Sequence, residues 1–310
     1  MCVSKSSKQR SSKLDERRLR RPRDGRRQLF ATAYAQASVF TIPVIVSVRY
    51  FDGSVSCGVA SYVVVNRAGW IITAAHVFDA GERYRAHARE VAAYNEQVRA
   101  IESDPQLGAP ARAQHIGALA TNPKWITDWS LWWGVDGLSV TDVRVLREAD
   151  LAIGRLQPFV PTMVSQYPVF KNPATLRFGV SLCKLGFPFS TVNATFDEAR
   201  HSFVFAQGTL PIPRFPIEGI YTRDIDNGMS SDGKYHVKFL ETSSPGLKGQ
   251  SGGPIFDTQG TVWAMQNQTI SLDLGFAVPN QYLNVGWGVH PEVLAAFLKA
   301  NGVEFSISDY

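Results

Sequence analysis

From about Pro43 onward, the sequence alternates short runs of β-branched and aromatic residues with turn-forming residues. Runs of roughly four to eight such residues, bounded by Gly, Asp or Asn, are typical of β-strands. The predicted strands are 44–50, 58–66, 70–73, 180–185, 203–206, 235–240, 261–265 and 276–278. Because strands and helices do not alternate regularly, the pattern predicts an all-β fold and excludes a parallel α/β sheet.

Two segments interrupt the strands with helical spacing. In residues 82–103 apolar side chains recur at helical intervals, and a Trp-rich stretch follows. Near the end of the chain, His290-Pro291-Glu292 opens a helix and Asn301-Gly302 closes it. The inserted segment, about 82–142, would either cover the core or act as a lid or partner-binding surface. Helical apolar stripes usually pack inward, which favours core cover, whereas grouped Trp residues are common interaction anchors.

Four prolines crowd residues 158–175, which we interpret as a linker between two β-rich halves. The first half would span residues 29–157 and include the insertion. The second would span residues 176–310 and include the terminal helix. A chain of 310 residues, 45% of them apolar, is long enough for either one large or two modest domains to bury a core.

The positive charge of the chain is concentrated at its start. Residues 1–28 hold 11 Lys and Arg against 3 Asp and Glu, whereas the remaining residues hold 21 against 24. This arm has too few apolar residues to fold, so we expect it to be disordered. Nothing in the chain combines a basic face with interleaved aromatic residues, so we expect nucleic acid to bind at most non-specifically, through the arm.

Cysteine content and the start of the chain indicate the cellular setting. Cys2, Cys57 and Cys183 are an odd number and too few for a disulfide framework, which favours a reducing compartment. No apolar stretch of signal-peptide length follows Met1, and no run approaches the roughly 18–20 apolar residues of a membrane span. We therefore expect a cytoplasmic protein without a membrane span, with organellar targeting left open.

Three segments carry residues whose side chains can perform chemistry together. They are the strand 69–77 with His76, the strand 149–153 with Asp150, and the glycine-rich turn 249–254 with Ser251. In that order they supply a general base, an orienting carboxylate and a nucleophile. The glycines allow backbone N–H groups to turn toward a developing oxyanion. Each segment alone is more often structural, but their joint order on β-rich segments favours a catalytic interpretation.

Gly249–Gly253 also matches G-x-S-x-G, the nucleophile elbow of α/β-hydrolases, in which an acid and then a histidine follow the serine. Asp257 or Asp273, followed by His290, would complete that order. The elbow requires a helix directly after the serine, and Gly-Gly-Pro is a poor helix start. We therefore reject the α/β-hydrolase interpretation.

With these motifs in place, the sequence resembles the chymotrypsin-like (trypsin-like) serine peptidase superfamily, and within it the bacterial-type HtrA/Deg protease domain. The resemblance spans about residues 43–285 and rests on Thr-Ala-Ala-His at 73–76, Asp-Leu-Ala-Ile at 150–153, Gly-Gln-Ser-Gly-Gly-Pro at 249–254, Leu-Gly-Phe-Pro at 185–188 and Gly-Phe-Ala-Val-Pro at 275–279. It implies two six-stranded antiparallel β-barrels, with a helical insertion in the first, a C-terminal helix, and an active site in the cleft between them. The first barrel would contribute His76 and Asp150, and the second Ser251. The backbone N–H groups of Gly249 and Ser251 would form the oxyanion hole.

The sequence departs from the digestive members of this superfamily around the serine. Gln250 replaces the aspartate that pairs with a new N-terminus after zymogen cleavage, so that activation route is not expected. Pro245 lies where a trypsin pocket aspartate would fall, which argues against Arg or Lys specificity. The substrate-binding positions implied by the resemblance are Pro245, Met265, Gln266 and Asn267. They suggest a pocket for an apolar or small side chain. We also expect no PDZ domain after the terminal helix.

The sequence therefore predicts a serine endopeptidase that hydrolyses peptide bonds of a protein or peptide substrate through an acyl-enzyme, without a cofactor or metal. The alternative is a catalytically silent binding or scaffold protein on the same fold. Silent relatives of enzymes usually lose a catalytic residue, and this chain keeps all three, so we favour the enzyme. The oligomeric state is left open.

Overall fold

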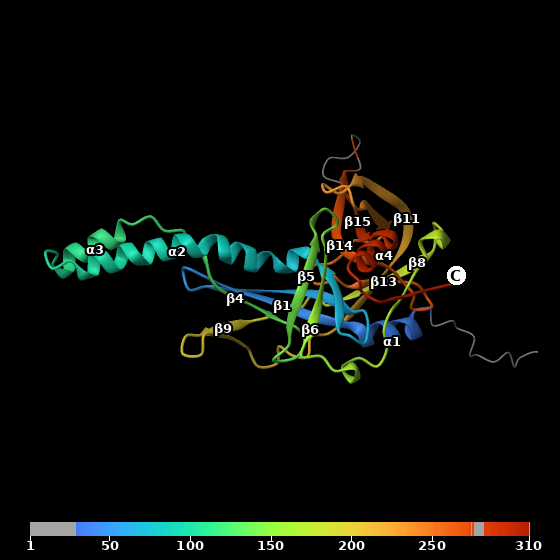
Figure 1. The fold of residues 1–310 in the computed structure, drawn as a ribbon, viewed down its shortest axis with the longest axis horizontal. Helices are drawn as coiled ribbons and strands as arrows, with labels where there is room; N and C mark the ends of the chain where they lie inside the picture. Colours follow the sequence, from blue (N-terminus) through green and yellow to red (C-terminus); the bar gives the residue numbers. More distant parts are fainter. Residues whose placement is uncertain (1–28, 274, 276–281, 310) are drawn as a thin grey trace, which may run out of the picture.

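The computed structural model describes residues 29–273, 275 and 282–309 (Figure 1). The predicted basic arm at 1–28, the predicted strand 276–278 and most of the motif at 275–279 lie outside these residues. Within the described part of the chain, no helix is both long and apolar enough to cross a membrane. The described elements are mainly strands, as the sequence pattern predicts.

The first half of the chain forms a curled six-stranded sheet in which every neighbouring pair is antiparallel. Its strands, in spatial order, are β4 (Ile126–Trp132), β1 (Thr41–Tyr50), β2 (Val55–Val64), β3 (Trp70–Ala74), β6 (Leu151–Gln157) and β5 (Ser139–Leu146). The predicted strands 44–50, 58–66 and 70–73 therefore form. Among the described pairings none joins β4 to β5, so hydrogen bonds do not close this sheet into the expected barrel.

The second half forms an eight-stranded sheet, six strands of which close into a ring. These six are β13 (Pro254–Phe256), β8 (Ser181–Gly186), β11 (Phe215–Met229), β12 (His236–Thr242), β15 (Tyr282–Val289) and β14 (Val262–Asp273), with β13 paired back to β14. Two short strands, β7 (Val169–Phe170) and β16 (Ser306–Ile307), extend the sheet from β14 with parallel pairing. The all-β class is thus confirmed, and of the two predicted six-stranded barrels only the second closes into a ring, whereas the first sheet stays open.

Two further parts of the sequence pattern fold differently from the expectation. The Trp-rich stretch of the predicted insertion is part of the first sheet, because it contains β4, which pairs with β1. The segment predicted as a linker contains β7 and the 3₁₀ turns Pro161–Met163 and Pro173–Thr175. A separate hairpin of β9 (Ala194–Asp197) and β10 (Ser202–Phe205) completes the strands.

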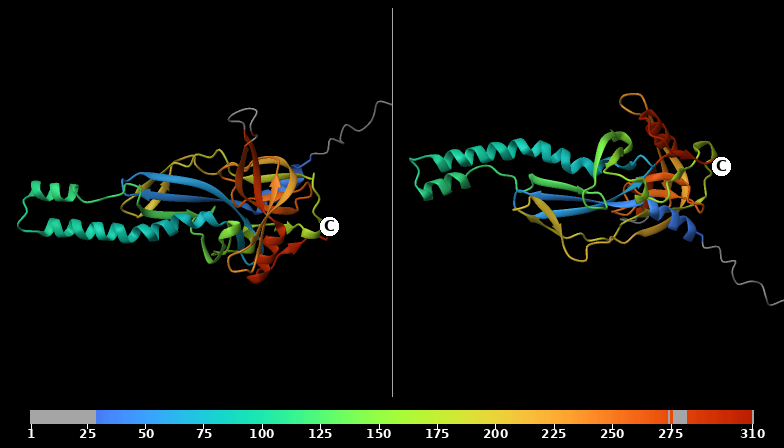
Figure 2. Two further views of the ribbon diagram at one scale, coloured as in Figure 1. Left: turned by 90° about the horizontal axis from the view of Figure 1, so that it is seen from above. Right: turned by 60° about the horizontal axis from the view of Figure 1, so that its bottom comes forward.

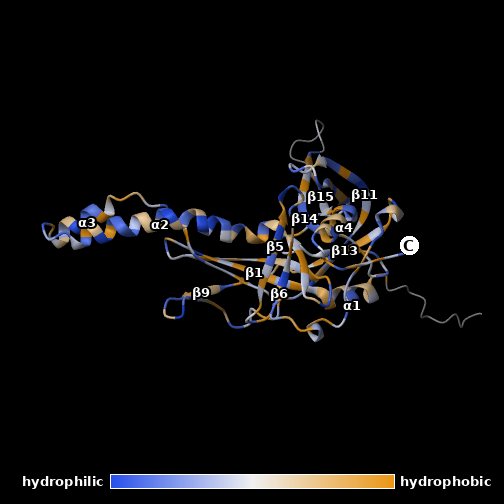
Figure 3. Ribbon diagram, viewed as in Figure 1, coloured by the Kyte–Doolittle hydropathy of each residue, from blue (hydrophilic) through white to orange (hydrophobic). Residues whose placement is uncertain are grey.

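Among the described residues, four α-helices accompany the sheets: α1 (Ala31–Phe40), α2 (Asp79–Ser103), α3 (Ala109–Gly117) and α4 (Pro291–Ala300). The helix predicted at 82–103 is α2, which begins three residues earlier. Together α2 and α3 project from the body as a long hairpin in every view (Figures 1 and 2). Its surface is mixed and largely hydrophilic (Figure 3). Only Ala80 and Gly81 of α2 are buried, and no residue of α3 is, so these two helices do not cover the core.

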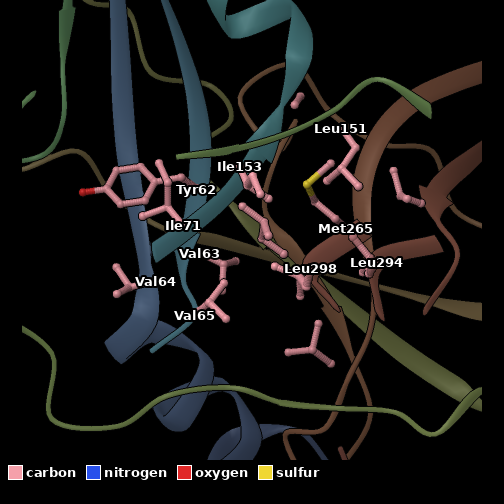
Figure 4. Close-up of a cluster of buried hydrophobic side chains, with 14 of the residues drawn as sticks. Tyr62, Val63, Val64, Val65, Ile71, Leu151, Ile153, Met265, Leu294 and Leu298 are labelled. Carbon is pink, nitrogen blue, oxygen red and sulfur yellow. The ribbon is translucent and has the colours of Figure 1, made fainter. Parts of the chain in front are cut away.

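One hydrophobic cluster spans both sheets and the terminal helix (Figure 4). Val63 of β2, Leu151 of β6, Met265 of β14 and Leu298 of α4 are each 0% exposed. Full burial of such a side chain stabilises the fold by about 1.5–3 kcal/mol. The shared core therefore fixes β3 and β6 relative to the second sheet, so that His76 and Asp150, at the adjacent ends of β3 and β6, have a fixed place relative to Ser251 before β13.

Candidate active site

His76 lies directly after β3, where the chain leaves the sheet through the 3₁₀ turn Ala75–Phe78. Its backbone N–H donates to Oδ1 of Asp150 over 2.9 Å. Its ring Nδ1 lies 2.8 Å from Oδ2 of the same carboxylate. Because a carboxylate accepts hydrogen bonds, Nδ1 carries the proton, and Nε2 remains available to act as a base.

Asp150 is held for this role by the strand pairing around it. β3 and β6 are neighbours in the sheet, so their adjacent ends bring His76 and Asp150 together. The backbone of Asp150 has φ +48°, in the left-handed region that Asp tolerates better than most residues. Its carbonyl also accepts a hydrogen bond from Ala75 N–H at 3.0 Å. The carboxylate therefore has a fixed position beside Nδ1 of His76.

This contact changes the proton affinity of the imidazole. The hydrogen bond to Asp150 raises the pKa of His76 above its ordinary value of 6.5, and this outweighs the opposing effect of burial. The charges of Asp150 and Asp79 act in the same direction, and that of Arg147 opposes them. A carboxylate that stabilises the imidazolium in this way is what a general base needs while it holds a proton.

Ser251 lies in the turn between β12 and β13, and this turn is bound tightly to the first sheet. The backbone carbonyl of Ser251 accepts a hydrogen bond from Ser61 N–H at 2.8 Å. The next residue, Gly252, has φ +84°, and a Cβ there would lie 2.0 Å from Ser61 O. Only glycine allows this approach, so the glycine after the serine positions Ser251 against β2.

Ser251 and His76 line one cavity of about 310 Å³. The Ser251 hydroxyl donates to the carbonyl of Asn267 over 3.4 Å. Among the described residues it makes no hydrogen bond with His76. The structure thus places Ser251 and His76 at one cavity, with the Ser251 hydroxyl turned toward β14.

The residue Gly249 has φ +100°, and a Cβ there would lie 2.4 Å from Phe187 O. Its carbonyl accepts hydrogen bonds from Phe187 N–H and from Ser61 Oγ, both at 2.9 Å, which turns that carbonyl away from the site. Within the described chain, the N–H groups of Gly249 and Ser251 have no hydrogen-bond partner. Two unpaired N–H donors beside a serine can stabilise an oxyanion.

The motif at 185–188 packs directly under this turn. A Cβ on Gly186 would lie 2.6 Å from the Cα of Gln250, so the glycine allows the two backbones to touch. The Gln250 side chain is buried, accepts a hydrogen bond from Leu247 N–H at 2.9 Å and donates to Phe215 O at 3.4 Å. Gln250 therefore fastens the serine loop by internal hydrogen bonds.

The predicted substrate-binding residues divide into two groups. Ser251 also borders a second cavity, of about 170 Å³, whose lining residues are Gly246, Leu247, Lys248, Ser251, Gln266, Asn267, Gln268 and Thr269. Gln266 and Asn267 are among them. Met265 is instead fully buried in the shared core. Pro245 does not line the cavity, and its carbonyl accepts a hydrogen bond from Lys184 Nζ at 3.0 Å.

Sequence reasoning missed two residues near this cavity. Thr269, which also lines the cavity, donates its hydroxyl proton to Gly246 O, and its place two residues beyond Asn267 on β14 was the available signal. Lys184 is 0% exposed within the predicted strand 180–185, and a lysine inside an apolar strand was the signal there. Burial lowers the pKa of Lys184 to about 7.

Comparison with known proteins gives a family for this chain. The model of the trypsin-like peptidase domain matches residues 60–265, which include His76, Asp150 and Ser251. No curated protein matches the sequence.

The solved structures that the chain matches include the Rv3671c protease from M. tuberculosis in its active form, at 13% identity and a TM-score of 0.47, covering 89% of this chain and 86% of that one. They also include the HtrA-type protease AlgW with a tripeptide, at 13% identity and a TM-score of 0.47, covering 88% of this chain and 63% of that one. The match to the trypsin-like peptidase domain, residues 60–265, covers more than half of the present chain, so this chain belongs to the trypsin-like peptidase family.

Proposed function

We propose that this protein is a serine endopeptidase that cleaves peptide bonds of a protein or peptide substrate through an acyl-enzyme. The observation that carries the proposal is the double contact between His76 and Asp150 at a cavity that Ser251 also lines. The N–H groups of Gly249 and Ser251, which have no acceptor within the described chain, also support it.

In the proposed reaction, Ser251 Oγ turns from Asn267 O toward His76 and attacks the substrate carbonyl. Nε2 of His76 accepts the hydroxyl proton, and Asp150 stabilises the resulting imidazolium. The carbonyl oxygen becomes an oxyanion, which accepts hydrogen bonds from Gly249 and Ser251 N–H. Collapse of the intermediate transfers the proton from Nε2 to the departing amine.

The second half of the proposed reaction repeats these roles with water. His76 accepts a proton from a water molecule, whose oxygen attacks the ester carbonyl of the acyl-enzyme. The ester bond to Ser251 breaks, Oγ regains its proton from His76, and the carboxylic acid product leaves. Every proton therefore passes through Nε2.

A fluorophosphonate probe tests this proposal, because it phosphonylates a serine only where the base and the oxyanion donors are in place. We expect the folded protein to be labelled at Ser251, and the Ser251→Ala and His76→Ala variants to remain unlabelled. Absence of labelling in folded wild-type protein would refute the proposal. It would favour the silent binding protein, for which Ser251→Ala would leave the cellular role unchanged.

A further inference from the structure

Lys184 of β8 carries a buried ammonium whose hydrogen-bond partners have no charge. The residue is 0% exposed. Its Nζ donates to Ser244 O, to Ser244 Oγ at 2.9 Å and to Pro245 O at 3.0 Å. These acceptors are two backbone carbonyls and one hydroxyl. A buried ion without a counterion costs more free energy than an apolar side chain of similar size. The role of Lys184 therefore has to lie in what these hydrogen bonds hold.

The titratable groups nearest to Lys184 along the neighbouring strands do not balance its charge. The Cys183 thiol, next to it on β8, has a pKa that burial raises to about 12, so the thiol is neutral. Glu218 of β11 pairs with Cys183 and is exposed to solvent. Glu241 of β12 is already bound by Arg223, at 2.9 Å. β13 has no titratable residue.

The other titratable residues of the elements around the ammonium lie further along them. They are Tyr221, Arg223, Asp224 and Asp226 on β11, His236 and Lys238 on β12, Tyr282 on β15 and Lys248 in the turn before β13. Burial is thus the main influence on the ammonium, and it lowers the pKa of Lys184 to about 7.

Lys184 is the residue at which the serine loop, residues 243–253, both begins and ends. Before the serine, its side chain binds the carbonyls of Ser244 and Pro245. After the serine, its backbone pairs with Ile255 of β13. The loop therefore leaves β8 and returns to it at one residue, and the ammonium is the fastening on the first side.

Hydrogen bonds within the loop connect this fastening to the oxyanion donors. Gly246, which follows the bound segment, has its carbonyl held by the Thr269 hydroxyl. Leu247 N–H donates to Gln250 Oε1 and Gln250 N–H donates to Leu247 O, both at 2.9 Å. Gly249 and Ser251 are the two neighbours of Gln250 in the sequence. A movement of the bound segment therefore reaches the residues whose N–H groups would bind the oxyanion.

The proton on Lys184 decides how firmly the loop is held. Hydrogen bonds from an ammonium are charge-assisted and about twice as strong as those from a neutral donor. A neutral amine keeps two N–H donors for the carbonyls of Ser244 and Pro245, and its lone pair can accept from the Ser244 hydroxyl. Loss of the proton therefore keeps these contacts but weakens them.

We propose that Lys184 is a positioning residue whose ammonium, by holding the start of the serine loop against β8, keeps the N–H groups of Gly249 and Ser251 in place. Loss of its proton loosens the loop and lowers the rate at which Ser251 reacts. This inference rests on the proposed peptidase function. It makes two residues responsible for the pH dependence of activity, and they act in opposite directions, because His76 must lose its proton to act as a base whereas Lys184 must keep its own.

The ratio of two labelling rates isolates Lys184 from His76. The fluorophosphonate is reacted with wild type and with Lys184→Met between pH 6 and pH 9, and His76 affects both rates equally. We expect wild type to react about tenfold faster at pH 6, which is part of the roughly 10²-fold or more that loss of an oxyanion donor costs. The ratio should fall to about two at pH 9, because the wild-type lysine is then neutral. A side chain that only fills space would give the same ratio at every pH.

Two controls distinguish a displaced loop from a loss of folding. Lys184→Met is expected to be at least as stable to urea as wild type at pH 6, since it removes a buried charge. Lys238→Met is the matched variant, because Lys238 lies on β12 and donates to the surface residue Glu292 at 2.9 Å. Its labelling rate should equal that of wild type at every pH.

Hydrogen exchange gives a readout that needs neither the variant nor activity. In wild type, the protection of the Leu247 and Gln250 amides, corrected for the intrinsic effect of pH on exchange, should fall between pH 6 and pH 9. Global stability should rise over the same range, because the unfolded chain keeps the proton on Lys184 that the folded protein loses. These opposite trends separate a loosened loop from unfolding.

The outcomes separate this inference from the proposed function. If wild type is labelled at Ser251 but the ratio to Lys184→Met does not change with pH, the assignment of Lys184 is wrong and the peptidase stands. Unchanged protection of Leu247 and Gln250 between pH 6 and pH 9 overturns the assignment as well. If wild type is not labelled at any pH, the peptidase is refuted, and the role of Lys184 in its activity with it.

Discussion

The carboxylate of Asp150 binds His76 twice, through the backbone N–H at 2.9 Å and through ring Nδ1 at 2.8 Å. The two residues are 74 positions apart in the sequence. One oxygen thus fixes where the histidine backbone lies and the other fixes how its ring is turned. An amide side chain at position 150 can still accept from the backbone N–H of His76, but it replaces the contact with ring Nδ1 less readily.

The Asp150→Asn variant is expected to lose activity while it remains folded. Asparagine keeps an oxygen that can accept from His76 N–H, but its NH₂ group would drive the ring toward the wrong tautomer. In peptidases with this triad such a change lowers kcat by roughly 10⁴. Steady-state kinetics and thermal unfolding of the purified variant measure the two effects. Glu148 lies two residues before Asp150 and accepts a hydrogen bond from the Ser231 hydroxyl, so Glu148→Gln serves as a control. Activity of Asp150→Asn within a few fold of wild type would contradict the assignment.

The raised pKa of His76 predicts a pH dependence for activity. The base must be neutral to accept a proton, so kcat/KM should rise with pH through a midpoint above the ordinary value of 6.5. Asp150→Asn removes the main cause of the raised pKa, so the residual activity should show a lower midpoint. A pH profile of kcat/KM for both proteins gives the measurement, and identical midpoints would argue against the pair.

The same contact predicts an opposite trend for stability. Because the folded-state pKa of His76 lies above the unfolded value, the ion pair stabilises the fold fully below pH 6.5 and is lost as the pH rises through the folded-state pKa. The free energy of unfolding of wild type minus that of Asp150→Asn should therefore be larger at pH 5.5 than at pH 8.5. Urea unfolding at both pH values measures it, and a difference that grows with pH would contradict it.

The close approach of Gly252 to β2 predicts a large cost for a methyl group. In Gly252→Ala the added Cβ would lie 2.0 Å from Ser61 O, at φ +84°. Gly53→Ala is the matched control, because its φ is +81° and a Cβ there meets nothing within 4 Å. The control should lose about 1–2 kcal/mol from the left-handed backbone alone. Gly252→Ala should lose more, measured by urea unfolding, and an equal loss would show that the contact with Ser61 relaxes freely.

The buried ammonium of Lys184 predicts a rise of stability with pH. Its pKa is about 7 in the folded protein and 10.5 in the absence of burial. The unfolded chain therefore binds the extra proton between these values, and folding stability should increase with pH across that window, by at most about 1.4 kcal/mol per pH unit. Lys184→Met should remove this contribution. Chemical unfolding of both proteins at pH 7, 8.5 and 10 tests this prediction. If the difference in free energy of unfolding between wild type and Lys184→Met is the same at all three pH values, the pKa of Lys184 in the folded protein is not about 7.

The sequence alone determined the local part of this protein. Alternation of β-branched runs and turns predicted β1, β2, β3 and β8, and the cap and apolar stripe predicted α4, because these signals depend on neighbours within a few residues. The motifs also named His76, Asp150 and Ser251 as candidates, since each depends on a short, local pattern.

Only the tertiary structure decided which contacts form between segments that are distant in the sequence. The tryptophans near residue 130 form β4 only because β1 offers a pairing edge, and Met265 faces the core although it adjoins two residues of the site. The sequence also could not predict that Gln266 Oε1 has no hydrogen-bond donor within the described chain, or that the Lys184 ammonium donates to Ser244 and Pro245. Each depends on which backbone groups of other strands come within hydrogen-bond distance, and only packing of the two sheets around their shared core fixes those distances.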